Sequence, residues 1–349
     1  MANHAIVIKS AGKAELVEAS VPTLREDYLL VKVKAVALNP TDILHIDLLA
    51  PVGARVGCDY AGVVEEVGAN VTKSFKKGDR VAGVAHGSNA VHHEDGTFSG
   101  IITVKGDLQI HIPENLGFEE AATLGIGITT VGQALYQSLG LSLPGEGQKD
   151  LSPILIYGGS TATGSLAIQY AKLSGKTVIA TASARNFDLV KRLGADEVFD
   201  YTSSTCASDI KKYTKGELTL AFDCISKGNS TQICIESMSD KGGIYTTLLP
   251  VPGDKVSAIN DKVENKSTLA YTAIGEAIQF GPQQIPAIPS HFEFAKKFWS
   301  ISEKLLADGD IKVHQLAINE GGSGLEGVLE GLKMVRAGDV RGRKLVYTI

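Results

Sequence analysis

The chain has 349 residues, of which 44% are hydrophobic and 21% charged, and its formal net charge is −5 at pH 7. This length favours two domains, and the acidic balance excludes the basic footprint of a nucleic-acid-binding protein. The sequence has four cysteines without a Cys-x-x-Cys pair, no apolar run of membrane-spanning length and no signal-peptide core in residues 1–20. We therefore expect a globular, cytoplasmic protein with no membrane and no nucleic-acid partner.

Short β-type runs separated by Gly and Asp turns fill the chain from residue 5 to about residue 112. This spacing predicts a small all-β barrel or sandwich, with strands over residues 5–8, 28–38, 60–67, 80–84 and 100–104. A helical region is expected from residue 113. Residues 125–130 lead to a second helix over 131–139, and a polar loop follows over 141–152.

The central stretch, residues 154–183, has the size of one βαβ unit. A β-branched run over 154–157 predicts a buried strand, apolar positions at helical spacing follow, and Gly175 ends the helix before a second strand over 177–182. The turn between the first strand and the helix directs helix N-terminal N–H groups at one point. Such a turn suits a pyrophosphate.

The glycine fingerprint of this turn is incomplete. Gly159 and Gly164 hold the outer positions of G-x-G-x-x-G, but Thr161 occupies the middle one. Its Cβ would push a ligand away unless side-chain hydroxyls replace the backbone contacts, as Ser160, Thr161 and Thr163 could. An ordinary βα turn without a ligand stays open as an alternative.

The residues after the second strand favour NADPH over NADH as the cofactor. The strand ends in Ser183-Ala184-Arg185-Asn186, with no carboxylate before Asp188. A hydroxyl and a guanidinium suit a 2′-phosphate, whereas NAD-dependent proteins place an acidic residue there. The alternative is that Arg185 is only a solvated residue at the start of a helix.

Strands and helices continue to alternate after this unit. Strands are predicted over 197–200, 219–224, 243–248 and, as the sixth of the sheet, 268–274; helices are predicted over 187–193, 209–213 and 230–237. The alternation predicts an α/β fold with a doubly wound parallel sheet covered on both faces. Helices over 292–307 and 327–335 and a last strand over 344–347 are expected to return to the first domain.

Several landmarks give the chain a family resemblance. Gly57–Gly68, Gly78-Asp79-Arg80-Val81 and Leu193-Gly194-Ala195-Asp196 resemble the medium-chain dehydrogenase/reductase superfamily over nearly the whole chain. Together with Asn39-Pro40-Thr41-Asp42, the Gly159–Gly164 turn and the tail, they are similar to the fungal trans-acting enoyl reductases that serve iterative polyketide synthases. The resemblance implies a GroES-like catalytic domain (1–126), a Rossmann NADPH-binding domain (127–283) and a C-terminal return to the catalytic domain (284–349).

The superfamily contains zinc alcohol dehydrogenases, and this chain lacks the residues that resemble their ligands. Asn39 stands where those enzymes carry Cys, Cys58-Asp59 replaces a His-Glu pair, and the four-cysteine lobe is missing. His92-His93-Glu94-Asp95 could hold a metal but is expected in a surface loop. We therefore predict a zinc-independent reductase that adds hydride to a C=C conjugated to a carbonyl, because alcohol oxidation would need a Lewis acid.

The resemblance also implies the site residues. The cofactor would contact Asn39, Pro40, Thr41, Asp42, Gly159, Ser160, Thr161, Ala162, Thr163, Gly164, Ser183, Arg185, Asn186, Tyr201, Leu248, Leu249, Val340 and Arg341. The acyl pocket would include Gly127, Ile128, Gln133, Ala134, Gly275, Gln279 and Phe280, with Thr129 or Thr130 as the polar group near the carbonyl. Tyr201 could instead cap a strand, and the two threonines could cap the helix expected at Val131.

The proton donor is left open by the sequence. Related mitochondrial enoyl reductases are associated with a Tyr after the Asn-Pro pair. Residues 43–51 contain no Tyr, and His45 is the only aromatic side chain among them, so water is the simplest proton source. The implied partners are an acyl-carrier-protein-bound polyketide intermediate and an iterative synthase, with a monomer favoured over a homodimer. A stand-alone NADPH quinone or enone reductase, and a non-catalytic scaffold that keeps the fold, are the competing hypotheses.

Overall fold

The computed structural model describes residues 3–147 and 150–349, and it divides into two compact units. Unit 1 comprises Met1–Thr129, Tyr271–Gly309 and Val313–Ile349, and unit 2 comprises Thr130–Ala270 and Asp310–Lys312. Residues 271–283 therefore pack with unit 1, although the sequence boundaries group them with the nucleotide domain. The expected domain boundaries stay a prediction.

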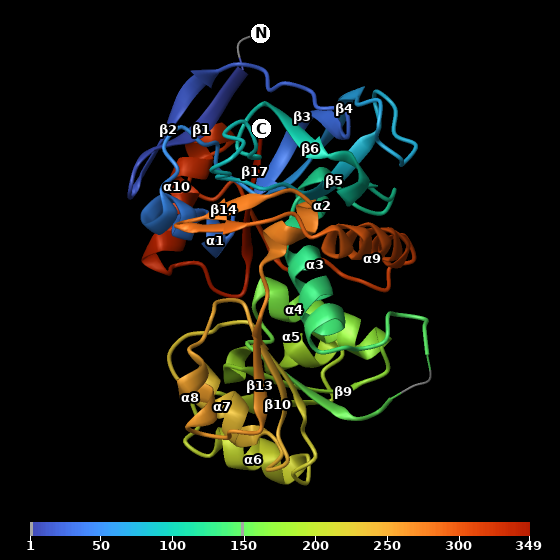
Figure 1. The fold of residues 1–349 in the computed structure, drawn as a ribbon, viewed down its shortest axis with the longest axis vertical. Coiled ribbons are helices and arrows are strands. Elements are labelled where there is room, and N and C mark those ends of the chain that lie inside the picture. The colour runs from blue at the N-terminus through green and yellow to red at the C-terminus, as the bar shows by residue number, and fades with distance from the viewer. Residues whose placement is uncertain (1–2, 148–149) are drawn as a thin grey trace. The chain divides into compact units, whose positions relative to one another are not determined.

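Unit 1 is built on strands that are antiparallel except for the parallel pair β16–β17 (Figure 1). Its main sheet has the order β16-β17-β3-β4-β5-β7, with β6 paired to β3, and β1 and β2 form a separate hairpin. The strands are β1 (Asn3–Ser10), β2 (Lys13–Ala19), β3 (Tyr28–Ala37), β4 (Asp59–Val67), β5 (Arg80–Val84), β6 (Ile101–Lys105), β7 (Gln109–His111), β16 (Leu316–Ile318) and β17 (Lys344–Thr348), with β14 (Ile278–Phe280) and β15 (Gln283–Ile285) as a second hairpin. The last strand pairs antiparallel with β3, so the end of the chain completes this sheet.

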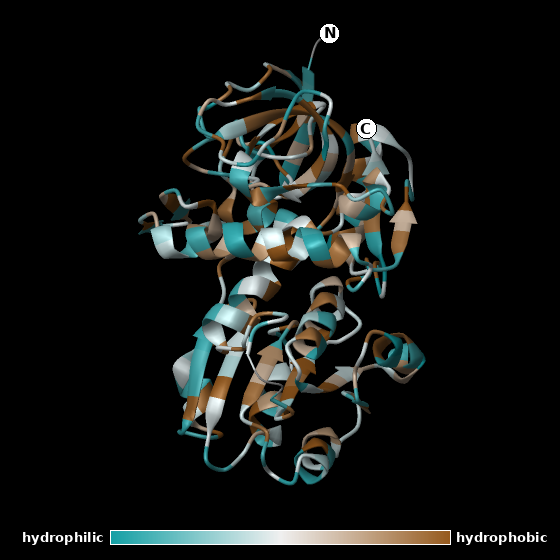
Figure 2. Cartoon of the chain, turned by 90° about the vertical axis from the view of Figure 1, so that its right-hand side faces the viewer, coloured by the Kyte–Doolittle hydropathy of each residue, from teal (hydrophilic) through white to brown (hydrophobic). Residues whose placement is uncertain are grey.

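Helices close the core of unit 1. They are α1 (Pro40–Leu44) with the π-helical turn η1 (His45–Leu49), the 3-10 turn η2 (Gly106–Leu108), α2 (Phe118–Ala121), α3 (Gly125–Val131), α9 (Pro289–Ala307) and α10 (Gly324–Ala337). Helix α10 buries Leu325, Val328 and Leu332 in the same core as Tyr60 and Tyr347 of the sheet. The helices in Figure 2 accordingly carry both hydrophobic and hydrophilic residues.

Unit 2 is a six-stranded parallel sheet in the order β10-β9-β8-β11-β12-β13. The strands are β8 (Pro153–Tyr157), β9 (Thr177–Ala182), β10 (Glu197–Asp200), β11 (Leu220–Asp223), β12 (Gly243–Thr247) and β13 (Val263–Ser267). The order reverses between β8 and β11, which is the doubly wound arrangement whose ligands bind at the carboxyl ends of the strands. The predicted α/β fold class is confirmed.

Helices cover both faces of this parallel sheet. They are η3 (Gly132–Ser138), α4 (Ala162–Leu173), η4 (Ala184–Asn186), α5 (Phe187–Arg192), α6 (Cys206–Tyr213), α7 (Ser230–Ser237) and α8 (Gly253–Ser257). Ile179 of β9 shares a core with residues of α6, α7 and α8. The next residue, Ala180, points to the opposite face of the sheet. There it packs with Gly159, Ile168 of α4 and Val190 of α5.

Two expected elements are wrong. The sixth strand is β13, not residues 268–274, which include the 3-10 segment η5 (Ala270–Ile274). The sequence of β13, VENKS, is polar and gives no β signal, yet it pairs in parallel with β12. Likewise, the helix expected over 131–139 already begins at Gly125, so residues 125–130, which were expected to lead to it, are themselves helical, and the helix continues as η3.

A glycine explains the early start of α3. A Cβ built on Gly125 would lie 2.4 Å from Gly83 O and 2.6 Å from Asp59 Oδ1. Gly125 thus allows the start of the helix to approach strands β4 and β5, which any side chain would prevent. In the part of the chain that the structure describes, no helix combines the length and apolarity needed to cross a bilayer.

Candidate active site

The nucleotide-binding turn of unit 2 is closed by one threonine side chain. Thr161 caps α4: its Oγ1 accepts from the Gly164 N–H at 2.9 Å and donates to Gly158 O at 2.9 Å. A Cβ on Gly164 would lie 2.2 Å from Gly158 O, and Gly158 itself has φ +81°. Thr161, which replaces the middle glycine of the fingerprint, therefore stabilises the turn through these two hydrogen bonds.

This turn fits the phosphates of a dinucleotide. Helix α4 has 12 residues and begins at Ala162, so the N–H groups of its first turn have no partner within the helix and carry the positive end of its dipole. The Thr161 hydroxyl is occupied inside the turn, so Ser160 and Thr163 stay the predicted hydroxyl contacts. The cradle that only glycine permits at position 164 supports a pyrophosphate there.

The four residues predicted to bind the adenosine phosphate gather at adjoining strand ends. Ala182 pairs with Asp200 in the β9–β10 register, so Ser183 and Tyr201 follow neighbouring positions at one edge of the sheet. Asn186 Nδ2 donates to Ser183 Oγ at 3.2 Å. Arg185 is exposed and has no ion-pair partner among the described residues, and Tyr201 is 42% exposed. Both side chains are open to a ligand.

The sequence did not point to the residues that hold Leu248 and Leu249. Ser226 Oγ accepts the N–H of Leu248 at 3.0 Å and of Leu249 at 3.3 Å. Buried Asp223, at the end of β11, in turn accepts the N–H of Ile225 and Ser226. The sequence signal that could have indicated these residues is an Asp and a Ser at the end of a predicted strand, where a parallel sheet binds its ligands.

A buried ion pair lies in unit 1 at the positions that the sequence compared with zinc ligands. Lys344 Nζ donates to Asp59 Oδ2 at 2.5 Å, to Asn39 Oδ1 at 2.9 Å and to Thr123 O at 3.1 Å. Asn39 Nδ2 also donates to Asp59 Oδ2 at 2.9 Å. The second oxygen, Asp59 Oδ1, accepts the Ile126 N–H at 2.6 Å. This carboxylate is therefore fully hydrogen-bonded within the protein.

Next to this ion pair, a second buried cluster surrounds Tyr271. Its hydroxyl lies 2.8 Å from Thr41 Oγ1 and 3.5 Å from Cys58 Sγ. Its ring stacks on His86, with centroids 4.3 Å apart, and meets the edge of His45 at 5.3 Å. Sequence reasoning missed Tyr271, because it lies 230 positions from Thr41 in a segment expected to be a strand.

Asp42 is buried in the same part of unit 1. Its Oδ2 accepts the Asn39 N–H at 2.7 Å, which completes a capping box at the start of α1. Burial raises the pKa of this carboxyl to about 8. Asp42 is therefore largely protonated at neutral pH.

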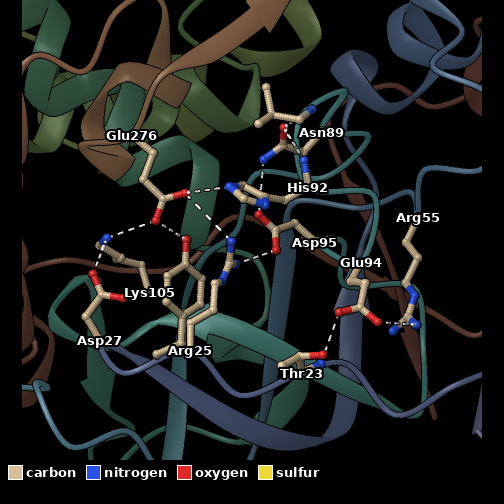
Figure 3. A network of polar contacts seen from close by, with 12 residues as sticks. Thr23, Arg25, Asp27, Arg55, Asn89, His92, Glu94, Asp95, Lys105 and Glu276 are labelled. Carbon is tan, nitrogen blue, oxygen red and sulfur yellow. Dashed lines mark hydrogen bonds and ion pairs between the residues drawn. The ribbon is translucent and has the colours of Figure 1, made fainter.

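A polar network ties the Tyr271–Phe280 segment to the β-sheet of unit 1 (Figure 3). Glu276 accepts from Tyr28 Oη at 2.6 Å and from Lys105 Nζ at 2.9 Å, and its carboxylate lies 3.8 Å from groups of Arg25 and His92. Gly275, with φ +78°, lets the chain pass Phe292, which a Cβ would approach to 2.8 Å. Segment 271–280 is thus held firmly.

Comparison with known proteins gives two family matches and several full-length relatives. Residues 25–114 match the alcohol dehydrogenase GroES-like domain, and residues 162–281 match the zinc-binding dehydrogenase family. The trans-enoyl reductase ACTTS2 of Alternaria alternata is 47% identical over 351 residues, covering 100% of this chain and 99% of the relative. The trans-enoyl reductase TOXD of Cochliobolus carbonum is 56% identical over 80% of this chain and 93% of its own. The chain belongs to the trans-enoyl reductases.

Solved structures show the same fold at lower identity. The CurK enoyl reductase superposes with a TM-score of 0.77 at 19% identity, covering 100% of this chain and 99% of its own. The quinone oxidoreductase of Coxiella burnetii gives 0.72 at 23% identity, covering 100% of both chains. The expected membership of the medium-chain dehydrogenase/reductase superfamily is confirmed. This trans-enoyl reductase is accordingly an oxidoreductase that uses a nicotinamide cofactor.

The zinc named in one matching family does not fit the residues of this trans-enoyl reductase. At the positions compared with zinc ligands, this chain has the Asn39 amide, which bonds to Lys344 and Asp59, and the Lys344 ammonium occupies the Asp59 carboxylate. The other candidate also fails, because Asp95 bonds to Arg25 at 2.5 Å and to Asn89. Within residues 3–147 and 150–349, no group of three or more His, Cys, Asp or Glu could hold a metal.

Thr129 has another use than the one expected in this enzyme. Its Oγ1 donates to Gly125 O at 3.1 Å and accepts from Trp299 Nε1 at 3.2 Å, and the side chain is buried. The alternative that it caps a helix at Val131 is wrong because α3 begins at Gly125, and its role near the reacting carbonyl stays a prediction. Thr130 stays a prediction.

The residues predicted for the acyl pocket are divided between the units. Gly127, Ile128, Gly275, Gln279 and Phe280 belong to unit 1, whereas Gln133 and Ala134 belong to η3 of unit 2. Within unit 1, the Phe280 ring lies 5.7 Å from that of His45 and 6.4 Å from that of Tyr271. Val340 and Arg341 lie between α10 and β17 as expected, and Arg341 is exposed. Their contacts with cofactor or acyl chain stay predictions.

Proposed function

We propose that this trans-enoyl reductase uses NADPH to reduce the C=C of α,β-unsaturated polyketide thioesters. The observation that carries the proposal is the Lys344–Asp59–Asn39 cluster, in a chain 47% identical along its whole length to a trans-enoyl reductase. A conjugated C=C accepts hydride without a metal-stabilised alkoxide, so the reaction suits a site whose carboxylate already pairs with an ammonium.

The cofactor choice is supported by the group at the end of β9. Arg185 and Ser183 offer a guanidinium and a hydroxyl for a 2′-phosphate, and Asn186 binds to the same hydroxyl. A carboxylate at this place would repel the phosphate dianion. Bound NADPH supplies the hydride, which adds to the β-carbon. The residues of the chain must then hold the enolate oxygen and bring a proton to the α-carbon.

The partner that we propose is an iterative polyketide synthase whose acyl carrier protein presents the substrate. The family name, trans-enoyl reductase, supports an enzyme that acts on an intermediate held by another protein. We further propose a monomer in the cytoplasm. All four cysteines are buried and free, as a reducing compartment allows.

NADPH consumption tests this function. A short 2-enoyl thioester, a free enone and a quinone are offered separately, and Arg185→Ala, which is expected to weaken NADPH binding, controls for cofactor dependence. Turnover of the thioester is the expected result. Turnover of only the enone or the quinone would instead identify a stand-alone reductase, which would share every cofactor residue. Failure to bind NADPH would identify a non-catalytic scaffold.

A further inference from the structure

The reduction leaves an enolate whose α-carbon needs a proton, and the segment after Asn39-Pro40 contains no tyrosine to supply it. The structure brings one from elsewhere. Tyr271 belongs to a segment remote in the sequence, but its hydroxyl contacts the residues after Asn39-Pro40, at 2.8 Å from Thr41 Oγ1. It lies beside both the Asn39–Asp42 segment predicted to contact the cofactor and Phe280, predicted to line the acyl pocket.

The surroundings keep this phenol protonated. Tyr271 is buried, with the rings of His86 and His45 against it and Cys58 Sγ at 3.5 Å from its oxygen. Burial raises the pKa of the hydroxyl well above its usual range. A protonated side chain is what the α-carbon of the enolate requires, since a general acid must hold the proton that it transfers.

We propose that Tyr271 is the catalytic acid that protonates the α-carbon; this inference rests on the proposed function. As hydride adds to the β-carbon, electrons of the C=C move onto the carbonyl oxygen as an enolate. The α-carbon then takes the proton of Tyr271: one C–H bond forms and the phenol O–H bond breaks. The tyrosinate accepts a hydrogen bond from Thr41 Oγ1; this hydroxyl is only partly buried, so it can pass its proton to the tyrosinate and take one from solvent in return.

The fold fixes this group for a directional transfer. Tyr271 and Glu276 belong to one short segment, and Glu276 is bound by Tyr28 and Lys105 of the sheet. Lys105 also pairs with Asp27 at 2.5 Å, so the anchor is itself held (Figure 3). A donor held rigidly on one side of the enolate delivers its proton to one face, whereas water can reach both faces.

The stereochemistry of the product therefore tests the proposal. An α-methyl-2-enoyl thioester and an α-methyl enone are reduced by the wild type and by Tyr271→Phe, and the α-configuration is measured by chiral chromatography. We expect a single configuration from the wild type. The variant should give a mixed configuration and a kcat lower by about 100-fold or more, with NADPH binding unchanged.

Two further variants separate the alternatives. Tyr347→Phe removes another buried hydroxyl of unit 1, which donates to Glu320 O at 2.8 Å, and should keep the wild-type configuration. Wild-type configuration and rate in Tyr271→Phe would overturn the proposal. So would a loss of selectivity in Asp42→Asn alone, which would assign the proton to Asp42. Reduction of the enone but not the thioester would refute the proposed function while still testing Tyr271, and reduction of neither would refute both.

Discussion

We expect Arg185 to decide between the two nicotinamide cofactors. It is exposed beside Ser183 and Asn186, so its guanidinium can meet a 2′-phosphate. Arg185→Ala should weaken NADPH binding by about 1.5–3 kcal/mol, the scale of a hydrogen bond to a charged group, and should leave NADH binding nearly unchanged. Titration of each cofactor, followed by its own fluorescence, measures both.

Arg192→Ala is the matched control, because Arg192 is an exposed arginine at the end of the adjacent helix α5. It removes the same charge and should change both affinities little. Equal losses for NADPH and NADH in Arg185→Ala would contradict a 2′-phosphate site at this strand end.

Lys344 compensates a buried negative charge and should be essential to the stability of unit 1. Lys344→Met leaves the Asp59 carboxylate buried without its cation, which should lower the free energy of unfolding by about 3–5 kcal/mol. Trp299 is the sole tryptophan of the chain and is buried in unit 1, so its fluorescence during urea unfolding reports on this unit.

Two comparisons give this result its meaning. The double variant Asp59→Asn with Lys344→Met removes both charges and should recover much of the loss. Lys191→Met opens the more exposed Lys191–Glu197 pair and should change stability by less than about 1 kcal/mol. A loss of that small size in Lys344→Met would show that the buried pair contributes little.

Local residue patterns predicted the βαβ unit that carries the proposed cofactor residues, but not the buried clusters of unit 1. Gly159, Gly164 and Arg185 lie in one continuous βαβ unit, where spacing alone places them. Lys344 and Tyr271 instead reach Asp59 and Thr41 across 285 and 230 positions of the chain. Only the packing of unit 1 brings such residues together, and no local pattern encodes it.

At the scale of elements, the turn between β8 and α4 brings Gly164 so close to Gly158 that one added methyl group would disrupt it. The Cβ of Gly164→Ala would lie 2.2 Å from Gly158 O, so the helix start must move. Overpacking of this kind costs about 1–3 kcal/mol. We expect a lower thermal midpoint and weaker NADPH binding, measured by circular dichroism and cofactor fluorescence. Gly253→Ala is the control, because no atom lies within 4 Å of its built Cβ.

Elements with a clear hydrophobic period were predicted closely, whereas the polar strand at the edge of the parallel sheet was not. Strands 80–84, 177–182 and 197–200 and helix 230–237 match the structure residue for residue. Strand β13 was missed because Val263 is its only buried residue, so no alternation marks it. The apolar residues that follow, Tyr271–Ile274, are buried in unit 1 as a 3-10 segment, and their hydrophobicity was mistaken for a strand.

At the scale of the whole molecule, buried titratable groups should set the pH dependence of stability. Burial raises the pKa of Asp42 to about 8 and of Asp95 to about 7, from a usual value near 3.8. The native state therefore binds more protons than the unfolded chain. The contribution of each carboxyl to the stability of the protein is lost as the pH rises from about 4 to its folded pKa. Burial lowers the pKa of His86 to about 3 and of His314 to about 4, so these groups make stability rise with pH up to about 6.5.

The two trends oppose each other below about pH 6.5, and only the carboxyl contribution remains above it. Burial also lowers the pKa of His45 and of His291, so we expect stability to be highest near pH 6.5 and then to decline to about pH 8, with a slope of up to about 1.4 kcal/mol per pH unit for each carboxyl. Urea unfolding at half-unit pH steps measures this curve. Asp42→Asn should flatten the decline, whereas Asp261→Asn, at an exposed position, should leave it unchanged. A decline that persists in full in Asp42→Asn would show that Asp42 is ionised in the folded protein at neutral pH.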